Sequence, residues 1–321
     1  MNTKGLSMNK PQALLVAGIS AELKNLLSEV VELVPLNKQG DVVQFLADHG
    51  SDFELVVTSA GKGCANALME QLPNLKVIFN WGVGYDKVDV EFASSRHVRV
   101  TNTPDVLNEC VADMAIGMLI AQARTMGESE RFVRRGEWLK NPTPPMGQKV
   151  TGKRLGIVGL GRIGLEAAKR AEAFSMQIRY HNRTPREDVN YAYEASILAL
   201  AEWSDYLLLL CPSTAATYRV IDREVLKALG PKGSLINIAR GAVVDQDALV
   251  DLLLLGELGG AALDVYENEP EVPEVLMDLP NVLLLPHVGS ATFETRTAMA
   301  QLVVDNVKAF IESETLVTPV N

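Results

Sequence analysis

Three side chains with complementary chemistry lie in the second half of the chain: Arg240, Glu269 and His287. A histidine titrates near neutral pH and is the natural general acid for a proton transfer. A carboxylate beside it favours the charged imidazolium, which keeps the proton ready for donation. A guanidinium binds carboxylates and stabilises negative charge that develops on a carbonyl oxygen. If these three groups lie together, they can protonate and polarise a carbonyl group.

The segments that precede these residues predict that they do lie together. Six strand-sized apolar segments alternate with helix-like segments, which predicts a parallel sheet covered by helices on both faces. Arg240, Glu269 and His287 follow the last three strands, and ligands of such sheets bind at the carboxyl ends. Each residue alone has an ordinary alternative: a structural ion pair, a solvated loop or a histidine at the core margin. Their convergence on one edge favours a catalytic site. The predicted strands are Leu155–Gly159, Gln177–His181, Tyr206–Cys211, Ser234–Ala239, Gly260–Asp264 and Val282–Leu285.

A glycine-rich turn follows the first of these strands, with Gly159, Gly161 and Gly164 in the pattern G-x-G-x-x-G. A helical pattern begins directly after it, and this strand–turn–helix context is typical of dinucleotide binding. Gly159 permits the tight turn, Gly161 lets a pyrophosphate approach the backbone, and Gly164 lets the helix pack close to the strand. Free N–H groups at the helix start then hold the phosphates. A tight turn in an unrelated α/β protein is the alternative interpretation.

The second strand ends without the acidic residue that sites specific for NAD use to bind the ribose 2′-hydroxyl. Asn182 stands in that place, about 20 residues beyond the glycines, and Arg183 and Thr184 follow it. A guanidinium and a hydroxyl can bind a 2′-phosphate, which a carboxylate would repel. We therefore predict NADPH as the preferred cofactor, with NADH as the alternative. A basic exposed turn without a cofactor role is the structural alternative.

The first 103 residues show a second, separate alternation of strands and helices. It ends near Thr103-Pro104, where the proline discourages helix in the residue before it. Gly82 and Gly84 follow the fourth strand, and the backbone N–H groups between them could form a small anion-binding nest. A simple turn is the alternative. The predicted strands are Ala13–Gly18, Val30–Val34, Glu54–Thr58, Lys76–Asn80 and Val98–Thr101.

Three further segments determine the expected domain organisation. Asp105–Arg124 reads as a helix that is apolar nearly all round, typical of burial between domains or subunits. Arg131–Lys149 shows no core of its own and is predicted to be an extended arm. Thr292–Glu312 is an amphipathic helix that we expect to cross back to the first domain. The predicted substrate domain is therefore 1–103 with 291–321, and the dinucleotide-binding domain is 104–290, with the helix and arm at about 105–150.

Composition excludes several classes of protein. The formal net charge of −10 argues against nucleic acid or an anionic membrane as a partner, since both attract basic surfaces. The three cysteines, an odd number without metal-ligand spacing, indicate a reducing compartment, and we predict no metal site. The polar N-terminus, about ten residues long, lacks an apolar signal core, so the expected location is the cytoplasm.

Several motifs resemble those of the D-isomer-specific 2-hydroxyacid dehydrogenase family. They are NWGVGYDKVD (Asn80–Asp89), GIVGLGRIG (Gly156–Gly164), NIARGAVVDQDAL (Asn237–Leu249), ALDVYENEP (Ala262–Pro270) and PHVGSAT (Pro286–Thr292). The resemblance covers nearly the whole chain after residue 10. It implies two doubly wound parallel-sheet domains, a flavodoxin-like substrate domain and a Rossmann-type cofactor domain, with an active-site cleft between them.

The resemblance also implies roles for individual residues. Arg240, Glu269 and His287 would be the catalytic trio, and the backbone of Val83-Gly84 would meet the substrate carboxylate together with Arg240 and His287. Asp264 would hold the nicotinamide carboxamide. The implied cofactor-binding set consists of Gly159, Gly161, Arg162, Ile163, Gly164, Asn182, Arg183, Thr184, Cys211, Pro212, Thr217, Ile238, Ala239, Arg240, Asp264, His287 and Gly289.

The expected activity is reduction of a small 2-oxo acid to the D-2-hydroxy acid. With an NADPH preference, the resemblance is greatest to glyoxylate/hydroxypyruvate reductases, and 2-ketogluconate reductase is the alternative substrate class. A cofactor-sensing corepressor is the alternative from another class, because such proteins share the fold and the trio. The resemblance further implies a homodimer joined through the helix Asp105–Arg124 and the arm, in which Trp138 either reaches the neighbouring site or packs within the interface.

Overall fold

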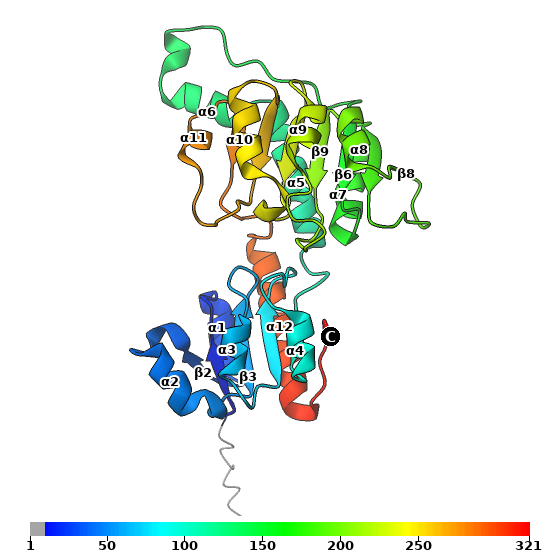
Figure 1. Cartoon of the computed structure of the whole chain (residues 1–321). Helices are drawn as coiled ribbons and strands as arrows, with labels where there is room; N and C mark the ends of the chain where they lie inside the picture. The colour runs from blue at the N-terminus through cyan, green and yellow to red at the C-terminus, as the bar shows by residue number, and fades with distance from the viewer. Residues whose placement is uncertain (1–9) are drawn as a thin grey trace, which may run out of the picture. The chain divides into compact units, whose positions relative to one another are not determined.

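The computed structural model describes residues 10–321, so most of the polar N-terminal segment lies outside the described residues. The chain divides into two compact units, coloured along the chain in Figure 1. Unit 1 consists of residues 10–107 with Thr292–Asn321, and unit 2 is Asn108–Ala291. The predicted fold class of two parallel α/β sheets is confirmed.

Unit 1 is built on a five-stranded sheet in the order β2-β1-β3-β4-β5, with every described pair parallel. This is the flavodoxin-like strand order expected from the resemblance. The sequence located all five strands, with ends that differ by up to three residues. They are β1 (Gln12–Leu15), β2 (Glu32–Pro35), β3 (Leu55–Ser59), β4 (Val77–Trp81) and β5 (Arg99–Thr101).

Alternate residues of these strands supply two apolar layers. Leu55 and Val57 of β3 pack with α1 and the long C-terminal helix, whereas Val56 packs with the helices of the opposite face. Side chains at the helix starts accept backbone N–H bonds, as Ser20 does from Leu23. One face carries α1 (Ala21–Ser28) and α12 (Phe293–Ser313). The other carries η1 (Leu36–Lys38), α2 (Val42–His49), η2 (Gly50–Asp52), α3 (Asn66–Glu70) and α4 (Val90–Ser95).

Unit 2 is built on a seven-stranded sheet in the order β12-β11-β10-β9-β6-β7-β8, again parallel throughout the described pairs. The order reverses between β6 and β9, the place where dinucleotides bind in sheets of this kind. The sequence missed β8, because two residues are too few to show a periodicity. The strands are β6 (Arg154–Val158), β7 (Gln177–His181), β8 (Ala192–Tyr193), β9 (Tyr206–Leu209), β10 (Ser234–Asn237), β11 (Gly260–Leu263) and β12 (Val282–Leu284).

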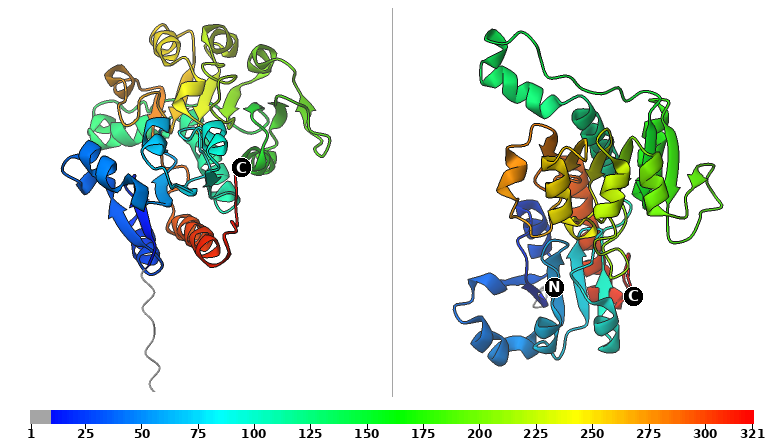
Figure 2. Two further views of the ribbon diagram at one scale, coloured as in Figure 1. Left: turned by 60° about the horizontal axis from the view of Figure 1, so that its bottom comes forward. Right: turned by 45° about the horizontal axis from the view of Figure 1, so that its top comes forward.

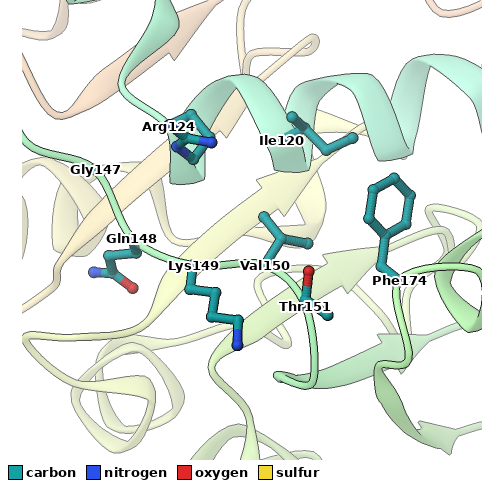
Figure 3. Close-up of a pocket in the computed structure, with 8 residues that line it drawn as sticks. All are labelled: Ile120, Arg124, Gly147, Gln148, Lys149, Val150, Thr151 and Phe174. Atoms are coloured by element: carbon teal, nitrogen blue, oxygen red, sulfur yellow. The ribbon is translucent and has the colours of Figure 1, made fainter.

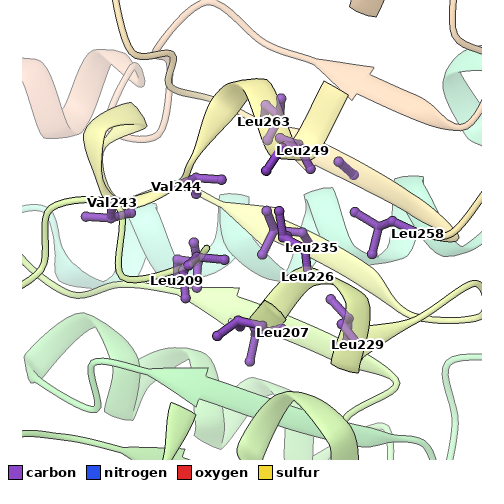
Figure 4. Packing of buried hydrophobic residues seen from close by; sticks show 14 of the residues in the cluster. Leu207, Leu209, Leu226, Leu229, Leu235, Val243, Val244, Leu249, Leu258 and Leu263 are labelled. Atoms are coloured by element: carbon purple, nitrogen blue, oxygen red, sulfur yellow. The ribbon is translucent and has the colours of Figure 1, made fainter. Parts of the chain in front are cut away.

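Helices cover both faces of this second sheet. On one face, Leu207, Leu209 and Leu235 join leucines and valines of α8, α9 and α10 in a continuous apolar cluster (Figure 4). On the opposite face α5 and α7 pack against each other, and α5 also contacts β10, β11 and β12. The helices of this unit are α5 (Asn108–Ala123), α6 (Met126–Arg134), α7 (Arg162–Glu172), α8 (Ile197–Trp203), α9 (Arg223–Leu229), η4 (Gly241–Val243), α10 (Gln246–Leu254) and α11 (Glu274–Met277).

The arm, residues 131–149, begins as helix rather than as the extended chain that the sequence predicted. The last residues of α6 fall within it, and η3 (Glu137–Leu139) follows. Charged pairs one turn apart, Arg131 with Glu128 and Arg134 with Glu130, stabilise this amphipathic helix. Beyond η3 the chain is irregular, as expected, and the arm protrudes from the rest of unit 2 (Figures 1 and 2).

Within residues 10–321 no helix is both long enough and apolar enough to span a bilayer.

Candidate active site

The glycine-rich turn joins β6 to α7 at the reversal point of the sheet. Gly159 has φ of +99°, and a Cβ there would lie 2.5 Å from the backbone N of Cys211 at the end of β9. A Cβ at Gly164 would lie 2.5 Å from the carbonyl oxygen of Gly159, so α7 packs directly on the turn. No heavy atom of the described residues lies within 4 Å of a Cβ built on Gly161. The turn therefore leaves the start of α7 accessible to a pyrophosphate.

Asn182 at the end of β7 binds this turn with its side chain. Its Oδ1 accepts the N–H of Leu160 at 2.7 Å, and its Nδ2 donates to the Leu160 carbonyl at 3.3 Å. Arg186 donates to the same carbonyl at 3.0 Å and forms an ion pair with Asp188. Asn182 thus positions the phosphate-binding turn, while Arg183 and Thr184 beyond it are exposed.

Glu269 and His287 lie on neighbouring loops after β11 and β12. Oε2 of Glu269 is 2.7 Å from Nδ1 of His287, and Oε1 accepts the backbone N–H of Tyr266 at 3.1 Å. The backbone N–H of His287 donates to the carbonyl of Asp264 at 2.8 Å. The structure therefore brings two of the three predicted catalytic side chains into direct contact.

Arg240 follows β10, the next strand of the sheet. Its Nη1 donates to the carbonyl of Ala239 at 2.8 Å. Asn237, which is 1% exposed, holds this turn because its Oδ1 accepts the N–H of Ala239 and its Nδ2 donates to the carbonyl of Arg240, both at 3.0 Å. No role was predicted for Asn237 from the sequence, where the available signal is a polar residue that directly follows two apolar residues at the end of a strand.

Asp264 is almost completely buried and is committed to the backbone. Its two carboxylate oxygens accept the N–H groups of Val288 and Gly289, each at 2.8 Å. Burial raises the pKa of Asp264, and these two hydrogen bonds and the nearby His287 only partly offset that rise. In this structure Asp264 positions the loop that carries His287, so the role toward the nicotinamide expected from the resemblance remains a proposal.

The charge of Glu269 depends on His287. Burial raises the pKa of Glu269, but the hydrogen bond and positive charge of His287, the N–H of Tyr266 and the charge of Arg240 together hold it below its ordinary value. Glu269 is therefore ionised at neutral pH. An anion in contact with an imidazole favours the imidazolium, which is the form that can donate a proton.

The remaining predicted residues lie near these loops or in unit 1. In unit 2, Cys211 is buried, and burial raises the pKa of its thiol to about 11, so it is neutral. Thr217 donates to the carbonyl of Pro212 at 2.7 Å, which closes the turn after β9. Val83 and Gly84 follow β4 in unit 1. Other members of the predicted set are buried or half-buried at strand or helix ends of unit 2: Ile163, Ile238, Ala239 and Gly289, while Arg162 is exposed at the start of α7.

No group of three or more His, Cys, Asp and Glu side chains that could hold a metal ion occurs in the part of the chain that the structure describes.

A glycine turn at the reversal point of a parallel sheet, with a carboxylate–imidazole pair at the same edge, defines a nucleotide-dependent oxidoreductase. Residues 116–289 match the family described as D-isomer specific 2-hydroxyacid dehydrogenase, NAD binding domain. The chain belongs to this family and is an NAD(P)-dependent dehydrogenase.

Individual relatives cover nearly the whole chain. Glyoxylate/hydroxypyruvate reductase A HPR2 of Arabidopsis thaliana and a hydroxyphenylpyruvate reductase of Plectranthus scutellarioides are each 47% identical over 307 residues, which is 96% of this chain and 98% of each relative. The solved structure of an NADPH-dependent glyoxylate/hydroxypyruvate reductase of Sinorhizobium meliloti, in complex with NADP and malonate, superimposes with a TM-score of 0.91 at 44% identity and 97% coverage of both chains.

Replacing Glu269 with Gln tests the dependence of the imidazolium on this carboxylate. Gln keeps a hydrogen-bond acceptor for His287 but removes the negative charge that favours an imidazolium. We expect kcat/KM for 2-oxo acid reduction to fall about tenfold or more at neutral pH, because the proton donor loses its stabilising partner. Toward acid pH Glu269 of the wild type keeps its charge below the pH at which an ordinary glutamate is protonated, because its pKa is lowered. The measurement is kcat/KM from pH 5 to 10.

The control is Glu271→Gln, which removes an exposed carboxylate from the same loop. An unchanged kcat/KM in Glu269→Gln, or an equal loss in both variants, would contradict the assigned role.

Proposed function

We propose that the protein reduces glyoxylate or hydroxypyruvate to the corresponding 2-hydroxy acid with NADPH. The observation that carries the proposal is the 2.7 Å contact between Glu269 and His287, at the same sheet edge as the glycine turn. It provides a charged proton donor at the edge of the sheet that binds the cofactor. The names of the Arabidopsis and Sinorhizobium relatives support the same substrates.

In the proposed mechanism the bound cofactor supplies a hydride to the carbonyl carbon of the 2-oxo acid. Arg240 binds the substrate carboxylate and stabilises the negative charge on the carbonyl oxygen. His287 donates the proton from Nε2 to that oxygen, so that one hydride and one proton convert the carbonyl to a hydroxyl. Glu269 holds Nδ1 and keeps the imidazole charged until the transfer. The backbone N–H groups of Val83 and Gly84 contribute a second set of carboxylate contacts.

The preference for NADPH rests on the residues after β7. Within this stretch Arg183 and Thr184 are exposed, and the negative charge of Asp188 is paired with Arg186. Asn182 rather than an acid stands at the end of β7, so the carboxylate that would bind a ribose 2′-hydroxyl and repel a 2′-phosphate is absent from that position, and the exposed Glu187 lies five residues further along. The Sinorhizobium reductase with bound NADP supports this proposal, and NADH is the alternative.

We also propose a homodimer joined through α5 and the arm. The arm exposes apolar side chains, with Leu139 95% and Met146 83% exposed, as expected for a surface that another chain covers. A pocket of about 370 Å³ lies where the arm returns to α5 (Figure 3). Ile120, Val150 and Phe174 supply its apolar lining. The three free thiols support the cytoplasm as the compartment.

The test of the proposed activity is oxidation of NADPH and NADH, measured side by side with glyoxylate, hydroxypyruvate, 2-ketogluconate and 4-hydroxyphenylpyruvate. We expect turnover on the order of 10 per second with NADPH and the two small acids, an ordinary enzymatic rate. Faster turnover of one of the two larger acids would replace the proposed substrate but keep the chemistry. Absence of turnover with all four would favour a cofactor-binding protein of the corepressor type.

Arg183→Ala tests the proposed 2′-phosphate site. Its guanidinium lies beyond the phosphate-binding turn, so its removal should weaken NADPH binding at least tenfold and leave NADH binding within about twofold. Asn182→Ala is the matched variant, because Asn182 holds the Leu160 backbone that both cofactors use. It should weaken both cofactors alike. Fluorescence titration gives the dissociation constants, and equal losses for the two cofactors in Arg183→Ala would sink the assignment.

Sedimentation velocity at micromolar concentration tests the proposed dimer. We expect a single species of twice the 34.9 kDa chain mass. Leu139→Glu should shift it toward one chain mass, because a charge buried in an apolar interface is costly. Leu254→Glu is the control, since Leu254 is an exposed apolar residue of α10 outside the arm. A wild-type protein that sediments as a single chain would overturn the proposal.

A further inference from the structure

The loop after β4 in unit 1, residues 82–84, has its three carbonyl groups bound by the ends of two strands. Asn80 donates from one Nδ2 atom to the carbonyls of Gly82 at 3.2 Å and Gly84 at 2.9 Å. Asn102 donates from its Nδ2 to the carbonyl of Val83 at 2.9 Å. The backbone N–H of Thr103 also donates to Gly82, at 3.0 Å. Three successive peptide groups are therefore fixed in orientation.

The orientation of the carbonyls determines where the N–H groups point. In a trans peptide the N–H of a residue points opposite to the carbonyl of the residue before it. Binding of the Gly82 carbonyl by Asn80 thus directs the N–H of Val83 away from Asn80. Binding of the Val83 carbonyl by Asn102 likewise directs the N–H of Gly84 away from Asn102. Neither N–H takes part in a hydrogen bond within residues 10–321.

We propose that Asn80 and Asn102 are positioning residues that hold the N–H groups of Val83 and Gly84 in place for the substrate carboxylate. The inference rests on the proposed function, because that function assigns the loop to carboxylate binding. Backbone N–H groups bind an anion well only when their direction is fixed before the anion arrives. The two asparagines meet that requirement without touching the substrate.

The register of the sheet explains why two asparagines share this task. Phe79 of β4 pairs with Thr101 of β5, so Asn80 and Asn102 occupy equivalent places at the carboxyl ends of adjacent strands. Asn80 is 0% exposed. Because both of its partners, the carbonyls of Gly82 and Gly84, are acceptors, the amide nitrogen rather than the amide oxygen must face the loop. A hydrophobic residue of similar size could fill the space but could not bind the carbonyls.

The loop itself is constrained at Gly82. Its φ is +144°, and a Cβ there would lie 2.5 Å from the Cβ of Ala60. Any residue with a side chain would be both strained and obstructed at this position. The backbone conformation of the loop therefore depends on Gly82, which avoids the steric clash, and on the hydrogen bonds from Asn80 and Asn102.

The C-terminal segment supports Asn102 from its other side. Thr318 donates from its hydroxyl to the Asn102 carbonyl at 2.7 Å. Asn306 of α12, which is 0% exposed, accepts the N–H groups of Val317 and Thr318, both at 3.0 Å. The segment runs beside β5, where the N–H of Val320 bonds to the Val100 carbonyl at 2.8 Å. The end of the chain thus takes part in holding the substrate loop.

Asn80→Ala and Asn102→Ala test the inference in the full-length enzyme with saturating NADPH. We expect the KM for glyoxylate to rise at least tenfold in each variant while kcat changes less than threefold, because a carboxylate contact is made in the ground state and the transition state alike. The dissociation constant of NADPH, which binds in unit 2, should stay within twofold. Thr318→Val should raise KM by a smaller factor of two to five.

Ile78→Ala is the matched control. Ile78 is a buried residue of the same strand whose side chain lies in the apolar core, so its loss destabilises unit 1 without freeing a loop carbonyl. Its KM should remain within twofold of wild type. An equal KM increase in Ile78→Ala, or unchanged KM values in both asparagine variants, would overturn the positioning role and leave the proposed function intact.

Binding of oxamate, a 2-oxo acid analogue that is not reduced, separates the proposed function from the positioning role of the two asparagines. Calorimetry on the enzyme loaded with NADP should show oxamate binding that both asparagine variants weaken at least tenfold. If wild type binds oxamate but turns over no 2-oxo acid, the proposed function is refuted. The positioning role is then still decided by whether the asparagine variants weaken oxamate binding. If wild type does not bind oxamate, the loop does not bind carboxylates and the inference fails.

Discussion

The contact between Glu269 and His287 depends on the alignment of two loops that leave adjacent parallel strands. Ala262 of β11 pairs with Leu283 of β12, and the two loops leave the sheet on the same side. Asp264 then fixes their relative position, because its buried carboxylate accepts two N–H groups from the loop of β12. A carboxyl buried in this way is costly unless its oxygens are bonded. Asp264 and the backbone of residues 288–289 therefore stabilise each other, and the catalytic pair depends on both.

A similar arrangement recurs at the carboxyl ends of β4, β5, β7, β10 and β11. At each of them a buried or half-buried amide or carboxylate binds backbone groups of a turn at that edge of the sheet, either the turn after its own strand (Asn80 and Asn237) or the turn after the neighbouring strand (Asn102, Asn182 and Asp264). A net gain of about 1 kcal/mol is typical of one such bond, but an unpaired buried partner costs about 1–3 kcal/mol. An alternative conformation of one of these turns would leave a buried polar group unpaired, and this cost stabilises the observed conformation. Loops that must present N–H groups or a charged side chain with fixed geometry need this kind of support.

The sequence was sufficient for the features that depend on local pattern. Apolar runs located all strands but β8, and the glycine spacing located the turn before α7. It did not reveal contacts between residues far apart in the chain. Asn182 was predicted to bind the cofactor, and nothing in the sequence indicated that its amide also binds Leu160, a residue 22 positions earlier. Asn80 and Asn102 are ordinary polar residues in sequence, and only the pairing of β4 with β5 brings them under one loop. The helix at the start of the arm was missed because the segment shows no core of its own in the sequence pattern.

A protein with a net charge of −10 nevertheless has to bind an anionic cofactor and an anionic substrate. Salt screens distant surface charges over about 8 Å at physiological ionic strength, so the groups near each anion decide the outcome. At the turn before α7 and at the loop 82–84 those groups are backbone N–H dipoles, which carry no titratable charge. Single guanidiniums, Arg183 and Arg240, supply the formal charge where a 2′-phosphate and a carboxylate are proposed to bind. Two acidic residues near these sites are paired, Asp188 with Arg186 and Glu269 with His287. Fixed dipoles and paired acids thus allow anion recognition on an acidic protein without a basic surface that would attract nucleic acid.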